Sequence, residues 1–501
     1  MILKPMSEDY KVIGHYLGKI VIGLGLLMIF PLIVAAGYSE IGPGIDYLLG
    51  ISIALFFGAI LAGACHTDKD LATGHAMCVA ALSWLVAMVI SAIPLFLSGH
   101  YGSYLDACFE TMSGYATTGL SLANDIDSMA YAHNFWRHLT MFVGGQGIVV
   151  IALTFLFRGT AGAFRIYVGE ARDERILPNV IHTARFIWLV SIVYMALGTA
   201  ALSISAIMGG LAPGKAIFDS LCIFMAAWDT GGFTPQSQSI LFYHNVSFEI
   251  ITVILMLLGS MNFALHYVVW TGNRKELYKN VETVTFFVSV LVTLSVTAWG
   301  FFGHDIYGGA AVFFRKVFYQ LISGHTGTGY TTIYPGQFLN EWGPLSMLGV
   351  TLAMAIGGSM CSTTGAIKVL RLGVLFKALR QDIKKILLPE SAVVVQKFHH
   401  IKDIILDDRH VRLSAIILLS YLGLYLLGTV ITMLYGYSLS EAAFESVSAA
   451  ANVGLSCGIT SPLMPTALKV TYMFQMWAGR LEFIAIFALG GMIVAALKGK
   501  R

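Results

Sequence analysis

The segment Gly327-Thr328-Gly329-Tyr330-Thr331 carries a pattern that occurs four times in the chain. In each copy a glycine is followed by a large apolar residue and then by serine or threonine. The other three copies are Thr117-Thr118-Gly119-Leu120-Ser121, Thr230-Gly231-Gly232-Phe233-Thr234 and Asn452-Val453-Gly454-Leu455-Ser456. Repetition at long and unequal intervals is typical of a repeat architecture with insertions in its loops. These four copies are called the glycine segments below.

An apolar stretch that is too short to cross a membrane leads into each glycine segment. A spanning helix needs about 20 apolar residues, and shorter stretches are typically buried or re-entrant helices. Each repeat is therefore predicted to contain a span, a half-helix, a glycine segment and a second span. The predicted half-helices are residues 104–116, 216–228, 312–325 and 440–452.

The composition indicates a polytopic membrane protein. Hydrophobic residues make up 57% of the chain and charged residues 12%, whereas soluble proteins have about 25% charged residues. The net charge of +3, without a dense basic tract, predicts no nucleic-acid partner. The 6 cysteines stand singly, which argues against a metal cluster or a disulfide framework. The segments long enough to span are about 12–37, 46–64, 76–98, 133–157, 186–209, 247–270, 281–303, 342–367, 411–436 and 466–497.

Basic residues gather in one set of connecting loops, including 158–185, 274–279 and 368–412, and at the C-terminus. By the positive-inside rule both termini are predicted to be cytoplasmic. The opposite loops are acidic and would concentrate cations at a pore mouth, although acidic loops are also common solvated loops. Their carboxylates are Glu40, Asp46, Asp106, Glu110, Asp125, Asp127, Asp219, Glu441 and Glu445.

The glycine segments are interpreted as the lining of one pore. Non-helical backbone at membrane depth is tolerated only where it is buried in protein or lines a watery cavity. Glycine allows backbone conformations that other residues reach only with strain. Four such segments around an axis would present carbonyl oxygens in place of the water shell of a cation, with the negative end of each half-helix aimed at the centre.

The glycine segments, together with the glycine-rich run 357–368 and the tail Ile405-Leu406-Asp407-Asp408-Arg409, resemble the Trk/Ktr superfamily of potassium transporters. The two spans before the first repeat make the chain most similar to the TrkH branch. The resemblance implies an all-α polytopic membrane protein with two N-terminal spans and four pseudo-repeats around one pore. The implied units are an extension (1–70), pore repeats 71–158, 180–275, 280–380 and 410–501, and a cytoplasmic connector (381–409).

The same resemblance implies which residues handle the ion. The selectivity glycines map onto Gly119, Gly232, Gly329 and Gly454. The implied potassium filter comprises Thr117, Thr118, Gly119, Thr230, Gly231, Gly232, Thr328, Gly329, Asn452, Val453 and Gly454.

A gate is implied below the filter, in the loop 357–365 with Gly357, Gly358 and Gly365, which would interrupt the second span of the third repeat. The alternative is a tightly packed Gly/Ser helix crossing. Arg480, in the middle of the last span, matches an arginine that projects into the pore. Its alternative role is a buried ion pair with a carboxylate such as Glu482.

Two residues depart from the usual pattern of the family. Asp229 is a candidate ligand at the outer mouth, or a cap for local backbone N–H groups. His325 could add pH sensitivity, or could simply be hydrogen-bonded. Because of these two residues, the sequence predicts the preference for potassium over sodium less well than it predicts the fold.

The implied partners are a second copy of the chain, a cytoplasmic ring of TrkA-type nucleotide-binding subunits and the lipid bilayer of a bacterial inner membrane. The amphipathic segment 368–412 is a candidate docking surface, or else a solvated membrane-facing surface. Potassium is the implied substrate, and no nucleotide is expected to bind this chain. Gly324–Gly329 has the glycine spacing of a P-loop, but Tyr330 stands where lysine is needed.

Other classes of function remain as alternatives. A sodium-coupled transporter also uses broken helices but should show two repeated halves. A non-selective K⁺/Na⁺ pathway of the same fold is a further possibility. A membrane enzyme would need a convergent catalytic cluster, and His133, His138 and His266 belong to no paired motif. The chain is therefore not expected to be an enzyme.

Overall fold

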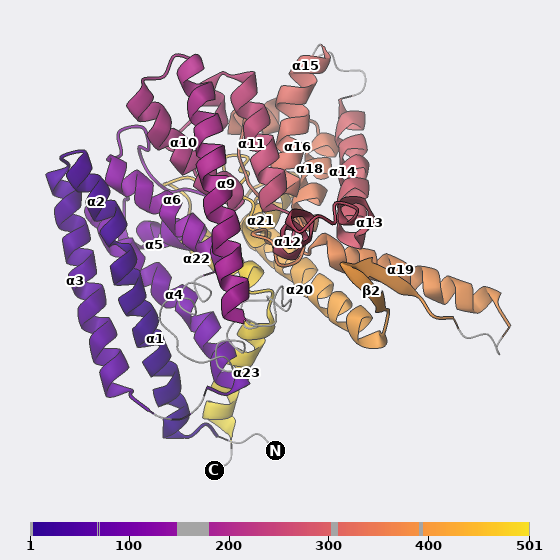
Figure 1. Ribbon diagram of the computed structural model, residues 1–501, viewed down its shortest axis with the longest axis horizontal. Helices are drawn as coiled ribbons and strands as arrows, with labels where there is room; N and C mark the ends of the chain where they lie inside the picture. Colours follow the sequence, from indigo (N-terminus) through magenta and orange to yellow (C-terminus); the bar gives the residue numbers. More distant parts are fainter. Residues whose placement is uncertain are drawn as a thin grey trace.

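The computed structural model describes residues 4–67, 69, 71–147, 180–301, 309–389 and 394–499. Within these ranges the protein is predominantly helical, and its two strands form one antiparallel hairpin (Figure 1). The hairpin joins β1 (Lys397–His400) to β2 (Lys402–Ile405).

Six helical segments in the described part of the chain are long and apolar enough to cross a membrane, and up to eight if each bent helix pair counts as one span. The expectation of an all-α polytopic membrane protein is therefore confirmed. The segments are α1 (Ser7–Leu27) continued by α2 (Ile29–Gly37), α3 (Ile41–Ala64), α4 (Thr73–Leu97), α9 (Val180–Met208), α14 (Val281–Gly300) and α20 (Asp408–Met433).

The N-terminal helices form one flank of the molecule (indigo in Figure 1). Helices α1 and α3 approach so closely that a Cβ on Gly18 would lie 2.4 Å from the backbone nitrogen of Ala62. A Cβ on Gly58 would lie 2.9 Å from the nitrogen of Ile22. Small residues at such crossings are the usual means of helix association in membranes, where lipid removes the hydrophobic driving force.

Four short helices correspond to the predicted half-helices. Three of them begin with a local signal: Ser103 and Ser438 accept backbone N–H bonds at the N-termini of the first and fourth, and Pro213 starts the second. The third continues from α15 (Ala310–Phe313) through a π-helical turn at Phe314–Phe318. The four are α5 (Tyr104–Tyr115), α10 (Pro213–Trp228), α16 (Tyr319–His325) and α21 (Leu439–Ala450).

In the second, third and fourth repeats the helix that follows the glycine segment is interrupted. We expected 247–270 and 466–497 to be continuous spans, and this expectation was wrong: the two helix pairs bend by 99° and 110°. The part of the predicted span 133–157 that follows Gly147 lies outside the described residues. The helices that follow the glycine segments are α6 (Tyr131–Gln146), α11 (Val246–Gly259) with α12 (Phe263–Trp270), α18 (Pro344–Ile356) with α19 (Val369–Leu387), and α22 (Thr466–Arg480) with α23 (Ile484–Lys498).

The helix after the glycine segment meets the end of its half-helix near the breaks in the second and fourth repeats, and near the end of α6 in the first. A Cβ on Gly144, Gly259 or Gly479 would lie 1.9, 2.0 and 1.9 Å from the last carbonyl oxygen of α5, α10 and α21, respectively. Close approach of two backbones therefore explains the glycines. Asn262 then starts α12 by accepting the N–H of Ala264, so polar side chains re-satisfy the freed backbone groups.

On the flank opposite α1–α3, α19 extends away from the body beside β2 (Figure 1). The hairpin packs on α14 and α19 through a small apolar cluster of Val281, Val374, Ala378, Phe398 and Leu406. Short helices complete the connections: η1 (Ser239–Tyr243), α13 (Glu276–Lys279) and α17 (Pro335–Asn340).

Candidate functional site

All four half-helices end in the same way. The first residue of the glycine segment adopts a left-handed conformation, and the next residue donates its N–H to a carbonyl five positions back, as in a Schellman motif. In the first repeat φ of Thr117 is +51°, and Thr118 N–H binds the carbonyl of Ser113 at 2.8 Å. The equivalent left-handed residues are Thr230 (+50°), Gly327 (+72°) and Asn452 (+57°). These three and Thr117 are called the base residues.

Two residues further on, the aligned glycine is left-handed again. The values of φ are +93° at Gly119, +77° at Gly232, +83° at Gly329 and +90° at Gly454. In an ordinary extended strand successive carbonyls point to opposite sides. Residues with positive and negative φ alternate in the glycine segments, and this alternation turns successive carbonyls to the same side. Glycine adopts a positive φ without strain.

The glycine segments touch one another in a closed cycle. A Cβ on Gly119 would lie 2.4 Å from the carbonyl oxygen of Gly231, and one on Gly232 would lie 2.1 Å from that of Thr328. A Cβ on Gly329 would lie 1.9 Å from the carbonyl oxygen of Val453, and one on Gly454 would lie 2.0 Å from that of Thr118. Each segment thus packs on the next, and the fourth returns to the first. This arrangement is called the glycine ring.

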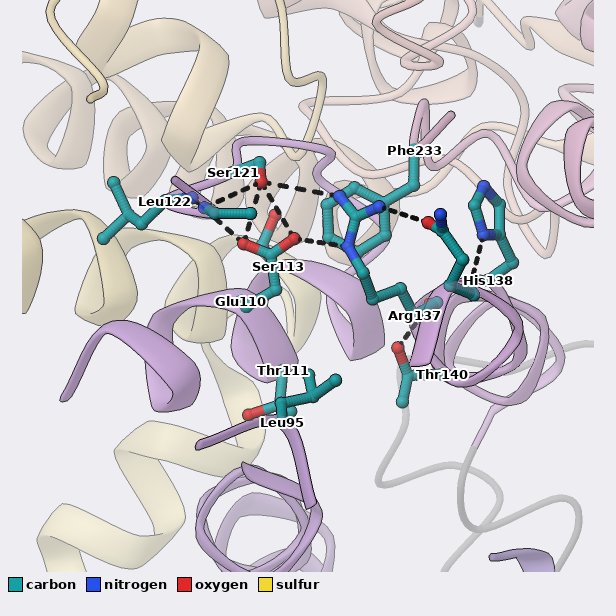
Figure 2. Close-up of polar contacts among 12 residues, drawn as sticks. Leu95, Glu110, Thr111, Ser113, Ser121, Leu122, Arg137, His138, Thr140 and Phe233 are labelled. Carbon is teal, nitrogen blue, oxygen red and sulfur yellow. Dashed lines mark hydrogen bonds and ion pairs between the residues drawn. The ribbon is translucent and has the colours of Figure 1, made fainter. Parts of the chain in front are cut away.

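Buried polar side chains anchor the irregular segments that follow the ring glycines. These segments are not β-strands of a sheet, but they are called the filter strands, or simply strands, below. Glu110 accepts the N–H of Leu122 at 3.0 Å and the hydroxyl of Ser121 (Figure 2). In the fourth repeat Glu445 accepts the N–H of Cys457 at 3.1 Å and the hydroxyl of Ser456 at 2.8 Å. These carboxylates come from the half-helices, nine positions before the ring glycines.

This burial corrects one expectation about the acidic loops. Asp106, Glu110, Asp219 and Glu445 were assigned to an acidic outer surface, but their exposed fractions are 4, 1, 1 and 0%. Asp106 is paired with Lys469 at 2.6 Å. Because these carboxylates are engaged inside the protein, they do not contribute to a solvent-facing acidic mouth.

The loop 357–365 lies directly beneath the glycine ring. Residues 357–368 are not helical, which excludes the alternative of a packed helix crossing. Gly357 ends α18 with φ of +74°. A Cβ on Gly358 would lie 2.9 Å from the carbonyl oxygen of Ser260. The glycines therefore allow the loop to turn inside the protein.

This loop and Arg480 approach all four base residues. Thr363 shares a hydrogen bond of 3.1 Å with the hydroxyl of Thr230. A Cβ on Gly365 would lie 2.6 Å from Oδ1 of Asn452, and one on Gly327 would lie 3.7 Å from Cβ of Thr364. The fourth contact, to Thr117, is made by Arg480 at 3.1 Å.

Arg480 also ties the loop to two helices. Its guanidinium donates to the carbonyl of Thr363, and to that of Gly144 at 2.9 Å. Glu482, the carboxylate considered as its alternative partner, binds Lys368 Nζ at 2.6 Å and Arg371. The cationic head of Arg480 therefore lies between the base of the ring and the loop.

Asp229 and His325, the two residues that depart from the family pattern, lie away from the outer mouth. Asp229 is the C-cap residue of α10 and is fully buried, and its carboxylate accepts an N–H of the Gln146 side-chain amide at 3.0 Å. Because the chain reverses at Thr230, this position is at the base of the ring, and the expectation of an outer-mouth ligand is corrected. His325 is buried and shares a hydrogen bond of 2.8 Å with Ser289.

Arg137 was not singled out as a site residue from the sequence. Its guanidinium is 1% exposed, pairs with Glu110 at 2.8 Å and lies 4.3 Å from the centre of the Phe233 ring (Figure 2). An arginine within a predicted span was the available signal, because a cation at membrane depth is costly unless it has partners. The partners themselves come from two repeats and were invisible in the sequence.

Comparison with known proteins agrees with this architecture. Residues 45–490 match the family model TrkH, described as cation transport protein. The chain is 31% identical to an uncharacterized cation transporter of Methanocaldococcus jannaschii over 97% of both chains. It is 28% identical to the Trk system potassium uptake protein TrkG of Escherichia coli, over 96% of this chain and 98% of that one.

Among solved structures, the crystal structure of the potassium transporter TrkH from Vibrio parahaemolyticus has the same fold. The TM-score is 0.79 with 22% sequence identity, over 97% of this chain and 98% of that chain. The family match covers most of the sequence, including all four glycine segments. The chain belongs to the TrkH family of cation transport proteins.

Proposed function

We propose that this protein takes up potassium through a pore whose selectivity filter is the glycine ring. The closed cycle in which each ring glycine lies against the carbonyl of the next segment is the observation that supports the proposal. Carbonyl oxygens can replace the hydration shell of a potassium ion, and half-helix C-termini add negative partial charge without a full anion that would trap the ion. The relatives named as potassium uptake proteins support this choice of ion.

No covalent chemistry is needed for this activity, and we propose that the chain is not an enzyme. The membrane potential would supply the driving force, about 2.3 kcal/mol per 100 mV for each charge moved. The proposed ion ligands are the filter residues 117–119, 230–232, 328–329 and 452–454.

We further propose that the loop 357–365 and Arg480 form the gate. Their approach to all four base residues supports this role, because an ion leaving the ring would meet the loop and the guanidinium. Conduction then requires the loop to move away from the ring. The glycines Gly357, Gly358 and Gly365 would make such a movement possible.

A chain of contacts leads from the hairpin to this gate. Glu282, at the start of α14 and fully buried, accepts the N–H of Met360 at 2.7 Å. Its other oxygen lies 3.8 Å from Nδ1 of His400 in β1. We propose that a cytoplasmic TrkA-type ring acts on the gate through the hairpin. We also propose a homodimer in a bacterial inner membrane, with both termini cytoplasmic.

Replacing Glu282 with glutamine is expected to raise basal ion flux several-fold. The variant weakens the charge-assisted hydrogen bond to Met360, and such bonds contribute about 1.5–3 kcal/mol. Rubidium flux into proteoliposomes measures the effect. Glu276→Gln is the matched control, because Glu276 binds His399 of the same hairpin at 2.9 Å but lies on α13. Equal flux in the two variants would show that Glu282 does not hold the gate closed.

The function itself is tested by ion uptake in cells that lack their own potassium uptake systems. Expression is expected to restore growth at low potassium and to produce rubidium uptake that exceeds sodium uptake. Absence of uptake by well-expressed protein would contradict the proposal. Rubidium uptake that requires a sodium gradient would instead indicate a sodium-coupled transporter, and equal uptake of both ions would indicate a non-selective pathway.

A further inference from the structure

The strands that leave the glycine ring are not anchored alike. In repeats one and four a glutamate of the half-helix accepts the backbone N–H three positions after the ring glycine, at Leu122 and Cys457. In repeat three Gln320 occupies the equivalent position and donates to the hydroxyl of Thr332 at 2.9 Å. In these three repeats the half-helix thus holds its own strand.

The second repeat lacks this arrangement. The position equivalent to Glu110 is Ile223, whose side chain has no hydrogen-bonding group. The residue three positions after Gly232 is Pro235, which has no N–H to donate. A carboxylate here would therefore have no backbone donor at that position.

Donors from the first repeat reach the second strand instead. Nη1 of Arg137 donates to the carbonyl of Thr234 at 3.3 Å, and Nδ2 of Asn134 lies 3.5 Å from the carbonyl of Pro235. The guanidinium also lies 4.3 Å from the ring centre of Phe233. Figure 2 shows the guanidinium of Arg137 over the ring of Phe233, with Glu110 beside it.

We propose that Arg137 is the positioning residue of the second filter strand, and that ion selectivity depends on this support from the neighbouring repeat. The inference rests on the proposed filter function. Glu110 orients Arg137 while holding the first strand, so one buried ion pair positions two of the four strands. Arginine suits this task because its planar fork can bond a carboxylate, donate to a carbonyl and lie on an aromatic face at once.

Arg137→Lys is the first test. Lysine keeps the charge next to Glu110, so the pair stays neutralised, but it loses the fork and the planar face. We expect the rubidium-to-sodium permeability ratio to fall about fivefold, the factor that corresponds to loss of one hydrogen bond, while rubidium flux persists. A merely structural role would lower the amount of folded protein and the flux of both ions together, leaving the ratio unchanged.

Arg315→Lys is the matched control. Arg315 also binds a buried glutamate, Glu249, at 2.8 Å, but its side chain is partly exposed and lies on another helix. The control should keep the wild-type permeability ratio. If Arg137→Lys and Arg315→Lys have the same ratio as the wild type, the inference is wrong even though the filter proposal stands. If the wild type itself is non-selective, the filter proposal fails first.

Phe233→Leu provides a second test that does not depend on the folding of the lysine variant. Leucine already occupies the equivalent position in repeats one and four, as Leu120 and Leu455. We expect a lower permeability ratio in this variant. In the double variant with Arg137→Lys the combined loss should be smaller than the sum of the single losses, because both substitutions remove the contact between the guanidinium and the Phe233 ring. Additive losses, or an unchanged ratio in Phe233→Leu, would overturn the inference.

Discussion

Replacement of Gly329 by serine is expected to reduce the discrimination between potassium and sodium by about tenfold or more. A Cβ at this position would lie 1.9 Å from the carbonyl oxygen of Val453, and φ is +83°. The serine must therefore displace the fourth glycine segment or change its own backbone conformation. Overpacking of a fixed site costs roughly 1–3 kcal/mol, and about 1.4 kcal/mol corresponds to a factor of ten. Competitive rubidium and sodium uptake measures the ratio.

Gly436→Ser separates the steric effect from backbone strain. Gly436 has a similar φ of +89°, but a Cβ there meets no atom within 4 Å. This variant should keep the wild-type ion preference, although its stability falls slightly because of the left-handed conformation. If both variants retain full discrimination, Gly329 does not belong to the filter. If both lose it, strain rather than the contact with Val453 explains the loss.

Replacement of Arg480 by alanine is expected to raise ion flux about tenfold. The substitution removes the donors to Thr117, Thr363 and Gly144 that hold the loop 357–365 against the ring. It also removes a positive charge from the proposed path. Hydrogen bonds to charged groups contribute about 1.5–3 kcal/mol each, so loss of a single one is enough for this change in gate opening. Flux of rubidium into proteoliposomes is the measurement.

Arg480→Lys is the informative companion variant. Lysine keeps the positive charge but cannot serve several acceptors with a planar fork. An intermediate flux would indicate that charge and tethering both restrict the ion. A flux in Arg480→Ala that is equal to or lower than that of the wild type would assign Arg480 a structural role. Arg480 would then no longer belong to the proposed gate.

The breaks in the interrupted helices show where sequence patterns mislead. Residues 247–270 and 466–497 are apolar enough to be read as continuous spans, yet both bend sharply. Hydropathy measures transfer to lipid and contains no information on where a second backbone approaches. Gly259 and Gly479 mark these approaches, but a glycine within a span also serves ordinary helix packing. Only the carbonyls of Trp228 and Ala450, distant in sequence, distinguish the two cases.

Burial of charge was equally difficult to foresee. Glu110 and Glu445 occur in loops and short helices where acidic residues are usually solvated. Their partners, Leu122 and Cys457, lie twelve positions away on strands that have no regular period. Asp229 was assigned to the wrong end of the ring because the direction of the chain after α10 depends on the left-handed turn at Thr230.

The amino-acid sequence by itself determined the membrane class, the four repeats, the positions of the half-helices and the ring glycines, because hydropathy, length and glycine are local properties. Only the tertiary structure decided which segments are neighbours, where the loop 357–365 and Arg480 lie, and that Arg137 supports a strand of another repeat. These features depend on contacts between residues far apart in the chain, and such contacts form only when the repeats close into a ring.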